Sequence, residues 1–586
     1  MLKQTSIAVL PFDHISADAE DAYLADGITE ELINALGKIE GLKVTARTSS
    51  FAYKGKKKDV RIIGNELGVA TVLEGSIRKA GKRLRIATQL IRTDNGFHIW
   101  SARFDRELTD IFALQDEISL LIAEKIRENF GHLDIADHLV QARTENMEAY
   151  QQYLKGRFYQ LNWRAEDFNR AVSCYQLSIT LDPAFYQPYF GLVQCYGIMA
   201  AWNFMDKDIA LATVDEYMRQ GLALAPESPE AYFAQATRAL WVNWEPEDAL
   251  RYLDQALAIA PHDTESLESA AEAYTALGRF DEALAHIRQA LEYNPLSANH
   301  YYTRGNAYYL QGRFQEALRW MDEALALDPH WDLALQVKAC CYVLREDQNA
   351  LFRLLKAHPN MPNAADLRLL YTLRNENQHP PPAEAAQPQF GYLPWDVYTP
   401  LYLGDTDAAL AALRHGIEGR IGPYINFRYD PLLAPLRTHP TYQRLCQDTF
   451  PAAAVARPVA AVREKPAAGL AEAEIRTAEA ALRTLMEEAR PYLSPELTLK
   501  DLAGQIDLHP NKLSWLLNEV MGQNFSEFIN GYRLAAFQAK ARQPAFDHYT
   551  LLGLAYECGF NSKSVFNEFF KKSTGQTPSA WRKANR

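Results

Sequence analysis

The chain has 586 residues, with 61 lysine and arginine residues against 73 aspartate and glutamate residues, which gives a formal net charge of −12. Its hydrophobic content of 48% and charged content of 23% are typical of a globular protein and exclude a disordered or collagen-like chain. A chain of this length exceeds a single hydrophobic core and predicts three or four domains.

The cysteines indicate a reducing environment. All six are scattered, none forms a Cys-x-x-Cys pair, and no histidine stands at metal-ligand spacing from them. We therefore expect free thiols, no metal, no cofactor and a cytoplasmic location. A strand follows Met1–Thr5 directly, so we expect no secretory signal. The uncharged stretch Pro183–Met205 is long enough to span a bilayer, but its polar and aromatic content favours a buried repeat helix.

Residues 1–130 predict a small α/β domain. Apolar alternation indicates strands over 7–12, 42–47, 71–78, 83–91 and 98–104, and helices are expected over 21–36, 60–67 and 112–130. The segments Ala8–Phe12, Gly27–Leu32 and Leu73–Ser76, together with Trp100, resemble the small α/β domain related to the TolB amino-terminal domain. That domain commonly precedes tetratricopeptide repeats in bacterial regulators and cyclases, so the resemblance implies architecture more than chemistry.

No catalytic motif was found. The sequence lacks a glycine-rich phosphate loop, a His-Glu-x-x-His helix and a Gly-x-Ser-x-Gly elbow, so we expect no enzyme. The basic run Lys54–Lys58 has the composition of an anion grip, although a solvated loop is the simpler interpretation.

Residues 145–450 predict an α-solenoid of tetratricopeptide repeats with degenerate C-terminal repeats. Helix-ending prolines recur at steps of 35, 34 and 34 residues, and small residues recur at a spacing of 34. These positions are Pro226, Pro261, Pro295 and Pro329, then Ala249, Ala283 and Ala317, and then Ala256, Ala290 and Ala324. An insertion is expected near 202–207, and Pro380–Pro382 mark an irregular loop.

The first helices of these repeats are expected to line a concave groove. Aromatic, amide and charged side chains on that face suit a peptide or a small polar ligand, while a ligand-free scaffold groove is the open alternative. The candidate groove residues are Arg238, Trp241, Glu268, Glu272, Tyr302, Asn306 and Tyr309.

Residues 451–470 predict an Ala/Pro-rich, semi-rigid linker. Residues 471–586 then predict an all-α domain with two helix-turn-helix units. The first unit turns at Asp507–Leu508 and begins its second helix at Pro510, a residue that suits a first helical turn. The second unit turns at Gly559–Asn561, and a long amphipathic helix over 525–541 joins the two units.

This tail resembles the DNA-binding domain of the AraC/XylS family of bacterial transcription regulators. The resemblance rests on Gly522–Phe525, Phe528–Leu534, Ala555, Gly559–Phe560, Ser564, Phe566, Phe570–Lys572, Gly575 and Thr577–Pro578. It implies that two reading helices enter successive major-groove segments of one face of a duplex. The implied base-reading residues are Asn511, Lys512, Ser514, Trp515, Ser562, Lys563, Ser564 and Asn567. Lys571, Lys572, Arg582 and Lys583 are the implied phosphate contacts. Trp515 and Glu568 stand where the family often has a basic residue. Packing and DNA contact are both open for Trp515, and solvent and a cytosine are both open partners for Glu568.

Charge agrees with this interpretation. From Ser494 onward there are 11 basic and 8 acidic residues, a net +3, on an otherwise acidic chain. The sequence thus predicts a one-component transcription regulator that binds double-stranded DNA and RNA polymerase, with residues 5–450 sensing a small molecule, peptide or protein partner. A repeat scaffold for protein docking is the alternative, and an enzyme of signalling-nucleotide metabolism is the weakest one. Inducer, operator, sign of regulation and a homodimeric state stay open.

Overall fold

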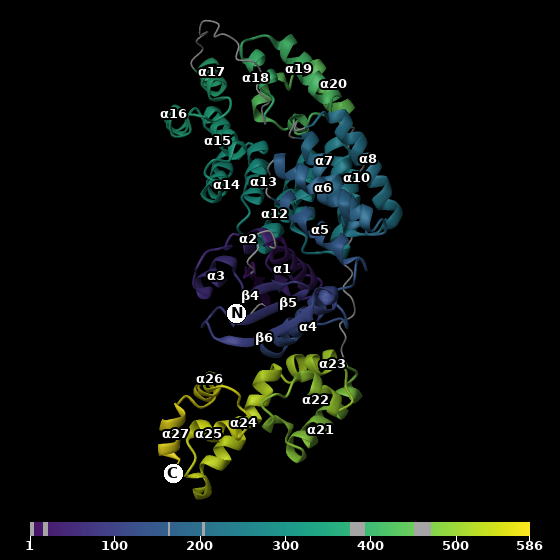
Figure 1. Cartoon of the computed structure of the whole chain (residues 1–586). Coiled ribbons are helices and arrows are strands. Elements are labelled where there is room, and N and C mark those ends of the chain that lie inside the picture. Colours follow the sequence, from purple (N-terminus) through teal and green to yellow (C-terminus); the bar gives the residue numbers. More distant parts are fainter. Residues whose placement is uncertain are drawn as a thin grey trace.

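A computed structural model describes residues 5–15, 22–161, 165–201, 205–375, 393–450 and 470–585. The linker expected over 451–470 lies outside these residues except for Leu470, and so do the loop at Pro380–Pro382 and residues 202–204 of the insertion expected near 202–207. Three parts follow one another in space: the α/β domain lies between the helical solenoid and the C-terminal helical domain (Figure 1). The fold is thus mainly α, with a small mixed sheet, as predicted.

The α/β domain is built on one mixed sheet of order β3-β1-β4-β5-β6, and β2 also pairs with β4. Strands β1, β3 and β4 are parallel, whereas β4, β5 and β6 form antiparallel hairpins. The strands are β1 (Ser6–Val9), β2 (Asp13–His14), β3 (Lys43–Val44), β4 (Thr71–Ala80), β5 (Arg83–Arg92) and β6 (His98–Glu107).

Alternation along β1 explains how helices cover both sheet faces. Ile7 and Val9 join the core formed with α1 (Ala22–Leu36) and α4 (Ile111–Phe130), whereas Ala8 packs with α3 (Val60–Leu67) on the other side. The short helix α2 (Arg47–Phe51) follows β3. Every strand and helix predicted for this region is present, although β1 and β3 are shorter than predicted.

The solenoid consists of antiparallel helix pairs that stack on their neighbours. Its first helices are α5 (Met147–Gln160), α6 (Ala165–Leu181), α7 (Gln187–Ala201), α8 (Lys207–Leu224), α9 (Pro229–Thr237), α10 (Pro246–Ile259), α11 (Thr264–Ala276) and α12 (Phe280–Tyr293). They are followed by α13 (Ala298–Leu310), α14 (Phe314–Leu327), α15 (Asp332–Leu344), α16 (Gln348–Ala357), α17 (Ala364–Asn375), α18 (Trp395–Tyr402), α19 (Thr406–Glu418) and α20 (Pro440–Thr449).

The predicted 34-residue period is confirmed by burial. The six alanines that carry the period are all 1% exposed or less. A methyl side chain lets paired helices approach closely, so these positions fix the packing of each repeat.

The end of the solenoid returns to its middle. The Tyr429 hydroxyl donates to the Leu277 carbonyl at 3.0 Å, and the rings of Trp244 and Phe450 stack at 6.3 Å. Tyr429 also fills the space beside Gly278, where a Cβ atom would lie 2.2 Å from the Tyr429 oxygen. The degenerate C-terminal repeats are therefore an integral part of the array.

The α/β domain contacts the solenoid at two places. Arg157 of α5 donates to Glu30 of α1, and Arg47 adds a second ion pair to Glu30 at 3.2 Å. At the other place, the Ser49 amide and hydroxyl donate to the Asn294 side chain, at 3.1 and 2.6 Å. The α/β domain is therefore held to the solenoid by two separate sets of contacts, one at α5 and one after α12.

The C-terminal domain has two small hydrophobic cores. The first is formed by α21 (Glu472–Glu488), α22 (Leu499–Gln505), α23 (Pro510–Trp515) and the start of α24 (Phe525–Ala541). The second is formed by the end of α24 with α25 (Leu551–Tyr556), α26 (Lys563–Thr574) and α27 (Pro578–Ala584). Among the described residues, neither core includes any from outside 470–585, which is the expected property of a segment that folds on its own.

Candidate nucleic-acid interface

The first helix-turn-helix unit is α22, a tight turn and α23. Thr498 caps α22 by accepting from the Asp501 amide at 3.1 Å, and His509 caps α23 by accepting from the Asn511 amide at 3.2 Å. Asp507 adopts a left-handed conformation, with φ of 52°, at the predicted turn. A π-helical turn, Leu516–Val520, ends the second helix of the unit.

The second unit is α25, a turn at Gly559 and α26. Gly559 has φ of 92°, and Ser562 caps α26 by accepting from the Val565 amide at 3.2 Å. Phe566 and Phe570 point into the second core, which leaves the polar face of α26 outside. The predicted turns, helix starts and connecting helix α24 are all present.

Arg533 joins the connecting helix α24 to the segment that precedes the first unit. Its Nε atom donates to the Tyr492 carbonyl at 2.8 Å, and its Nη2 atom donates to the Ser494 carbonyl at 2.7 Å. Burial lowers the pKa of Arg533 to about 10, still far above neutral pH. Gly559 packs directly beside these groups. Arg533 was one landmark of the family resemblance, but the sequence alone did not indicate this positioning role.

The predicted contacts on α26 lie on an accessible face. Lys563, Asn567 and Lys571 are exposed, and Ser562 and Ser564 are half-buried with their hydroxyls 2.9 Å apart. Lys572 is exposed but pairs with Glu527 of α24 at 2.7 Å. Glu568 is exposed on the same helix, which is compatible with both solvent and a cytosine as its partner.

The predicted contacts on α23 have different surroundings. Ser514 is completely buried, so in this arrangement it lies in the core and not on a surface that could read bases. Trp515 is half-buried against the first core, and Lys512 lies 3.6 Å from Glu474. Asn511 contacts the α/β domain: it accepts from Arg127 and donates to Asp134, both at 2.5 Å.

The seven candidate groove residues do not converge on one site. Arg238 pairs with Asp215 at 3.0 Å, and Trp241 is 36% exposed near Gly422. Tyr309 is 2% exposed, because Tyr398 and Asp430 of the returning C-terminal part pack near it. The repeat register predicted that Tyr309 lines the groove, because the sequence of one repeat does not indicate which later segment packs over it.

Four of the candidate residues lie in the part of the solenoid where the groove was predicted: Glu268, Glu272, Tyr302 and Asn306. Glu268 is buried and accepts from Asn299 and Thr303, each at 2.7 Å, with His300 at 3.2 Å. Burial and the neighbouring Glu268 charge raise the pKa of Glu272 well above its usual range. Within the described ranges Glu272 forms no ion pair, and Tyr302 and Asn306 are half-buried. This acidic and aromatic part of the inner surface is what remains of the predicted groove.

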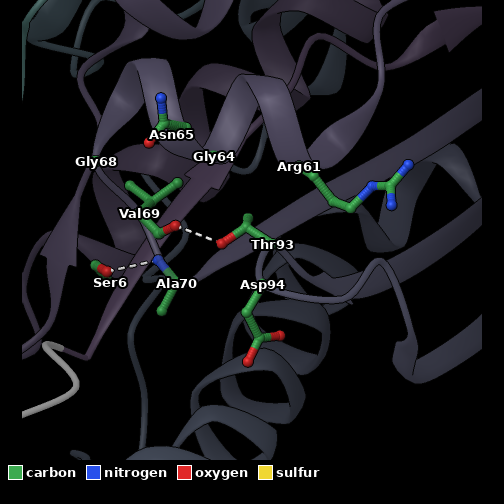
Figure 2. A pocket seen from close by; sticks show the side chains of 9 residues that line it. All are labelled: Ser6, Arg61, Gly64, Asn65, Gly68, Val69, Ala70, Thr93 and Asp94. Atoms are coloured by element: carbon green, nitrogen blue, oxygen red, sulfur yellow. Dashed lines mark hydrogen bonds between the residues drawn. The ribbon is translucent and has the colours of Figure 1, made fainter.

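A hollow of about 530 Å³ lies beside α3 (Figure 2). Its polar groups are used within the fold: the Ala70 amide donates to Ser6 at 2.9 Å, and Thr93 donates to the Val69 carbonyl at 2.7 Å. Arg61 pairs with Asp59 at 2.5 Å. The described parts of the chain hold no group of three or more potential metal ligands and no helix long and apolar enough to cross a membrane.

Three family models match the chain. A helix-turn-helix domain matches residues 502–584, tetratricopeptide-repeat models match residues 235–290 and 268–330, and the second domain of HilA/YgeH-like transcriptional regulators matches residues 3–121. The last match gives the domain that we expected to be TolB-like a counterpart within transcriptional regulators.

Individual relatives cover parts of the chain. A Rhizobium meliloti (strain 1021) protein described as "Putative adenylate cyclase 3" is 38% identical over 258 residues, which are 43% of this chain and 41% of that protein. The type IV pilus biogenesis factor PilW is 15% identical over 38% of this chain and 98% of its own, with a TM-score of 0.33. Human IFIT1, crystallised as a dimer with m7Gppp-AAAA, is 15% identical over 72% of this chain and 78% of its own, with a TM-score of 0.32.

The helix-turn-helix match begins within α22 and covers the rest of the first unit, the connecting helix and the second unit, whose geometry is given above. The chain therefore joins a HilA/YgeH-like regulator domain and a tetratricopeptide-repeat array to a C-terminal DNA-binding domain of the AraC type.

Proposed function

We propose that the protein is a one-component transcription regulator of the cytoplasm, whose α/β domain and repeats sense a ligand or protein partner and whose tail contacts operator DNA and RNA polymerase. The observation that carries this proposal is the pair of helix-turn-helix units joined by α24, which Arg533 anchors to the segment before α22. Helix α26 presents Lys563, Asn567 and Lys571 on one accessible face, which suits base and phosphate contacts from the major groove.

The sensing part of the proposal rests on the solenoid. Glu272, Tyr302 and Asn306 offer a carboxyl group, an aromatic ring and an amide, a combination that suits a polar ligand. The alternative proposal, a docking scaffold with the tail as an anchor, rests on the same surface. Deletion of the gene separates the two, because a regulator predicts promoters that respond, whereas a scaffold predicts a retained protein partner of residues 1–450 and no responding promoter.

The direct test uses residues 470–586, which contain both cores of the C-terminal domain. We expect this fragment to select a preferred sequence from a random duplex pool and to bind it less tightly as salt rises, because phosphate contacts release counterions. Lys563→Ala should relax the sequence preference. Arg483→Ala, which removes an exposed charge from α21, is the matched control and should leave the preference unchanged.

Failure of the fragment to bind duplex DNA at low ionic strength would contradict the proposed function. Binding without any salt dependence would contradict the phosphate-contact model. An unchanged preference in Lys563→Ala would remove this lysine from the reading surface.

A further inference from the structure

The C-terminal end of α4 contacts the first helix-turn-helix unit where DNA would bind. Arg127 of α4 is 1% exposed; its Nη1 atom donates to the Asn511 side-chain oxygen, and its Nη2 atom donates to Glu124, each at 2.5 Å. The side-chain nitrogen of Asn511, Nδ2, in turn donates to the Asp134 carboxylate at 2.5 Å and to the Ile135 carbonyl at 3.3 Å. Both ends of the Asn511 amide are thus occupied by the α/β domain.

Further hydrogen bonds join the same two surfaces. The Leu499 amide, at the start of α22, donates to the buried Glu128 carboxylate at 3.1 Å. The Asn524 side chain donates to the Asn129 carbonyl, and Ser526 donates to the Asn129 side chain, each at 3.1 Å. Residues from the starts of α22, α23 and α24 therefore all bind one short segment of α4 and the loop after it.

The second unit faces the same domain. Helix α26 lies beneath the sheet, on the side of β6 (Figure 1). The hydrogen bond and charge of Asp94 raise the pKa of Arg92, at the end of β5, and the charge of Glu568 of α26 adds to this shift. The α/β domain therefore contacts the first unit directly, whereas the polar face of α26 stays exposed.

We propose that this contact is autoinhibitory: the α/β domain clamps the C-terminal domain in an arrangement that excludes duplex DNA, and activation requires release of Asn511 from Arg127 and Asp134. The inference rests on the proposed function and concerns the regulation of the same site. Its physical basis is that Asn511 stands at the start of the reading helix, the part of a helix-turn-helix unit that contacts base edges. A base pair cannot approach an amide whose donor and acceptor already have protein partners at 2.5 Å.

The clamp also gives the solenoid a way to act on DNA binding. The α/β domain is fixed to α5 through Glu30 and Arg157, and to the loop before α13 through Ser49 and Asn294. A ligand that shifts the solenoid can favour the released state only if it binds that state more tightly. The α/β domain contacts both the solenoid and the C-terminal domain. It therefore couples ligand binding in the solenoid to release of the C-terminal domain.

The test compares DNA affinity of the full chain with that of residues 470–586 on the selected duplex. We expect the full chain to bind at least about tenfold more weakly than the fragment. In the full chain, Asp134→Ala removes an exposed partner of Asn511 without changing a core, and Arg127→Ala removes the buried one. Each should recover at least about threefold of the lost affinity, and the double variant should recover more. Asp137→Ala, an exposed carboxylate of the same loop, is the matched control and should recover none.

A structural readout keeps the test independent of folding defects. The Leu499 backbone amide should be protected from hydrogen exchange in the full chain and should lose this protection in the fragment and in Asp134→Ala. The helical circular dichroism of full-length Asp134→Ala should equal that of the unchanged full chain. Equal affinity of the full chain and the fragment would overturn the clamp while the proposed function stands. Weaker binding by the full chain that neither variant relieves would also overturn it, because masking would then come from elsewhere. Absence of binding by the fragment would instead contradict the proposed function.

Discussion

Glu30 of α1 and Arg157 of α5 form a largely buried ion pair that joins the α/β domain to the first helix of the solenoid. Burial by itself would raise the pKa of Glu30, but the charges of Arg157 and Arg47 lower it overall. A second pair, Glu31 with Arg143 at 3.2 Å, lies beside it. The α/β domain is therefore fixed to the solenoid by charges that depend on one another.

Arg157→Met should destabilise this junction. The variant leaves the Glu30 carboxylate with Arg47 alone in a water-poor site, and breaking a buried pair from one side costs about 3–5 kcal/mol. We expect the first thermal transition to move down and hydrogen exchange of α1 to accelerate. Arg170→Met, which breaks a pair whose arginine is 61% exposed, is the control and should cost less than about 1 kcal/mol. An unchanged first transition in Arg157→Met would show that the pair does not hold the junction.

Gly559→Ala should destabilise the C-terminal domain. At φ of 92° a Cβ atom would lie 2.2 Å from the Tyr492 carbonyl oxygen and 3.0 Å from the Arg533 Nε atom. The left-handed backbone alone costs roughly 1–2 kcal/mol, and the clash adds to it. Gly531→Ala is the matched control: this position lies within α24 with open space around a Cβ atom, so we expect a gain of about 0.5–1 kcal/mol. Urea unfolding of residues 470–586 measures both, and equal midpoints would contradict the prediction.

Periodicity predicted more of this fold than of its sites. The 34-residue spacing of buried alanines defined the solenoid, and the turn at Gly559 defined the second helix-turn-helix unit, because both signals are local in sequence. The assignment of Tyr309 to the groove was wrong, because Tyr309 is buried near Asp430, more than a hundred residues away along the chain. Repeat spacing does not indicate that the C-terminal repeats fold back onto this position. Arg127 and Asn511 are separated by 384 residues, and neither has a pattern that indicates the other.

Lys571→Ala should weaken DNA binding by residues 470–586 uniformly across sequences. Lys571 is exposed near the end of α26, where a phosphate contact would position the helix without reading a base. Loss of one phosphate contact should reduce the slope of log affinity against log salt concentration by about one. Lys572→Ala should have a smaller effect, because Lys572 is paired with Glu527. A change in sequence preference without a change in slope would place Lys571 at a base instead.

The stability of the C-terminal repeats should depend on pH through Asp430. This carboxyl is 6% exposed and accepts from the Tyr398 hydroxyl and, at 2.8 Å, from the Leu432 amide. Burial raises its pKa from 3.8 to about 6 despite these hydrogen bonds. The folded state therefore holds a proton that the unfolded state has already lost, so this contribution to stability is present below about pH 4 and is lost as pH rises through 6. The loss amounts to about 3 kcal/mol.

Asp430→Asn should remove this dependence, because an amide stays neutral and its oxygen can still accept from Leu432 and Tyr398. We expect the melting temperature of the variant to be close to that of the unchanged chain at pH 4 and to exceed it increasingly between pH 5 and 7. Asp405→Asn, at the exposed N-cap of α19, is the control, since water solvates its side chain in both states. A constant difference across this range would mean that Asp430 is ionised in the folded protein throughout, and that Tyr398 and Leu432 stabilise its charge more than burial disfavours it.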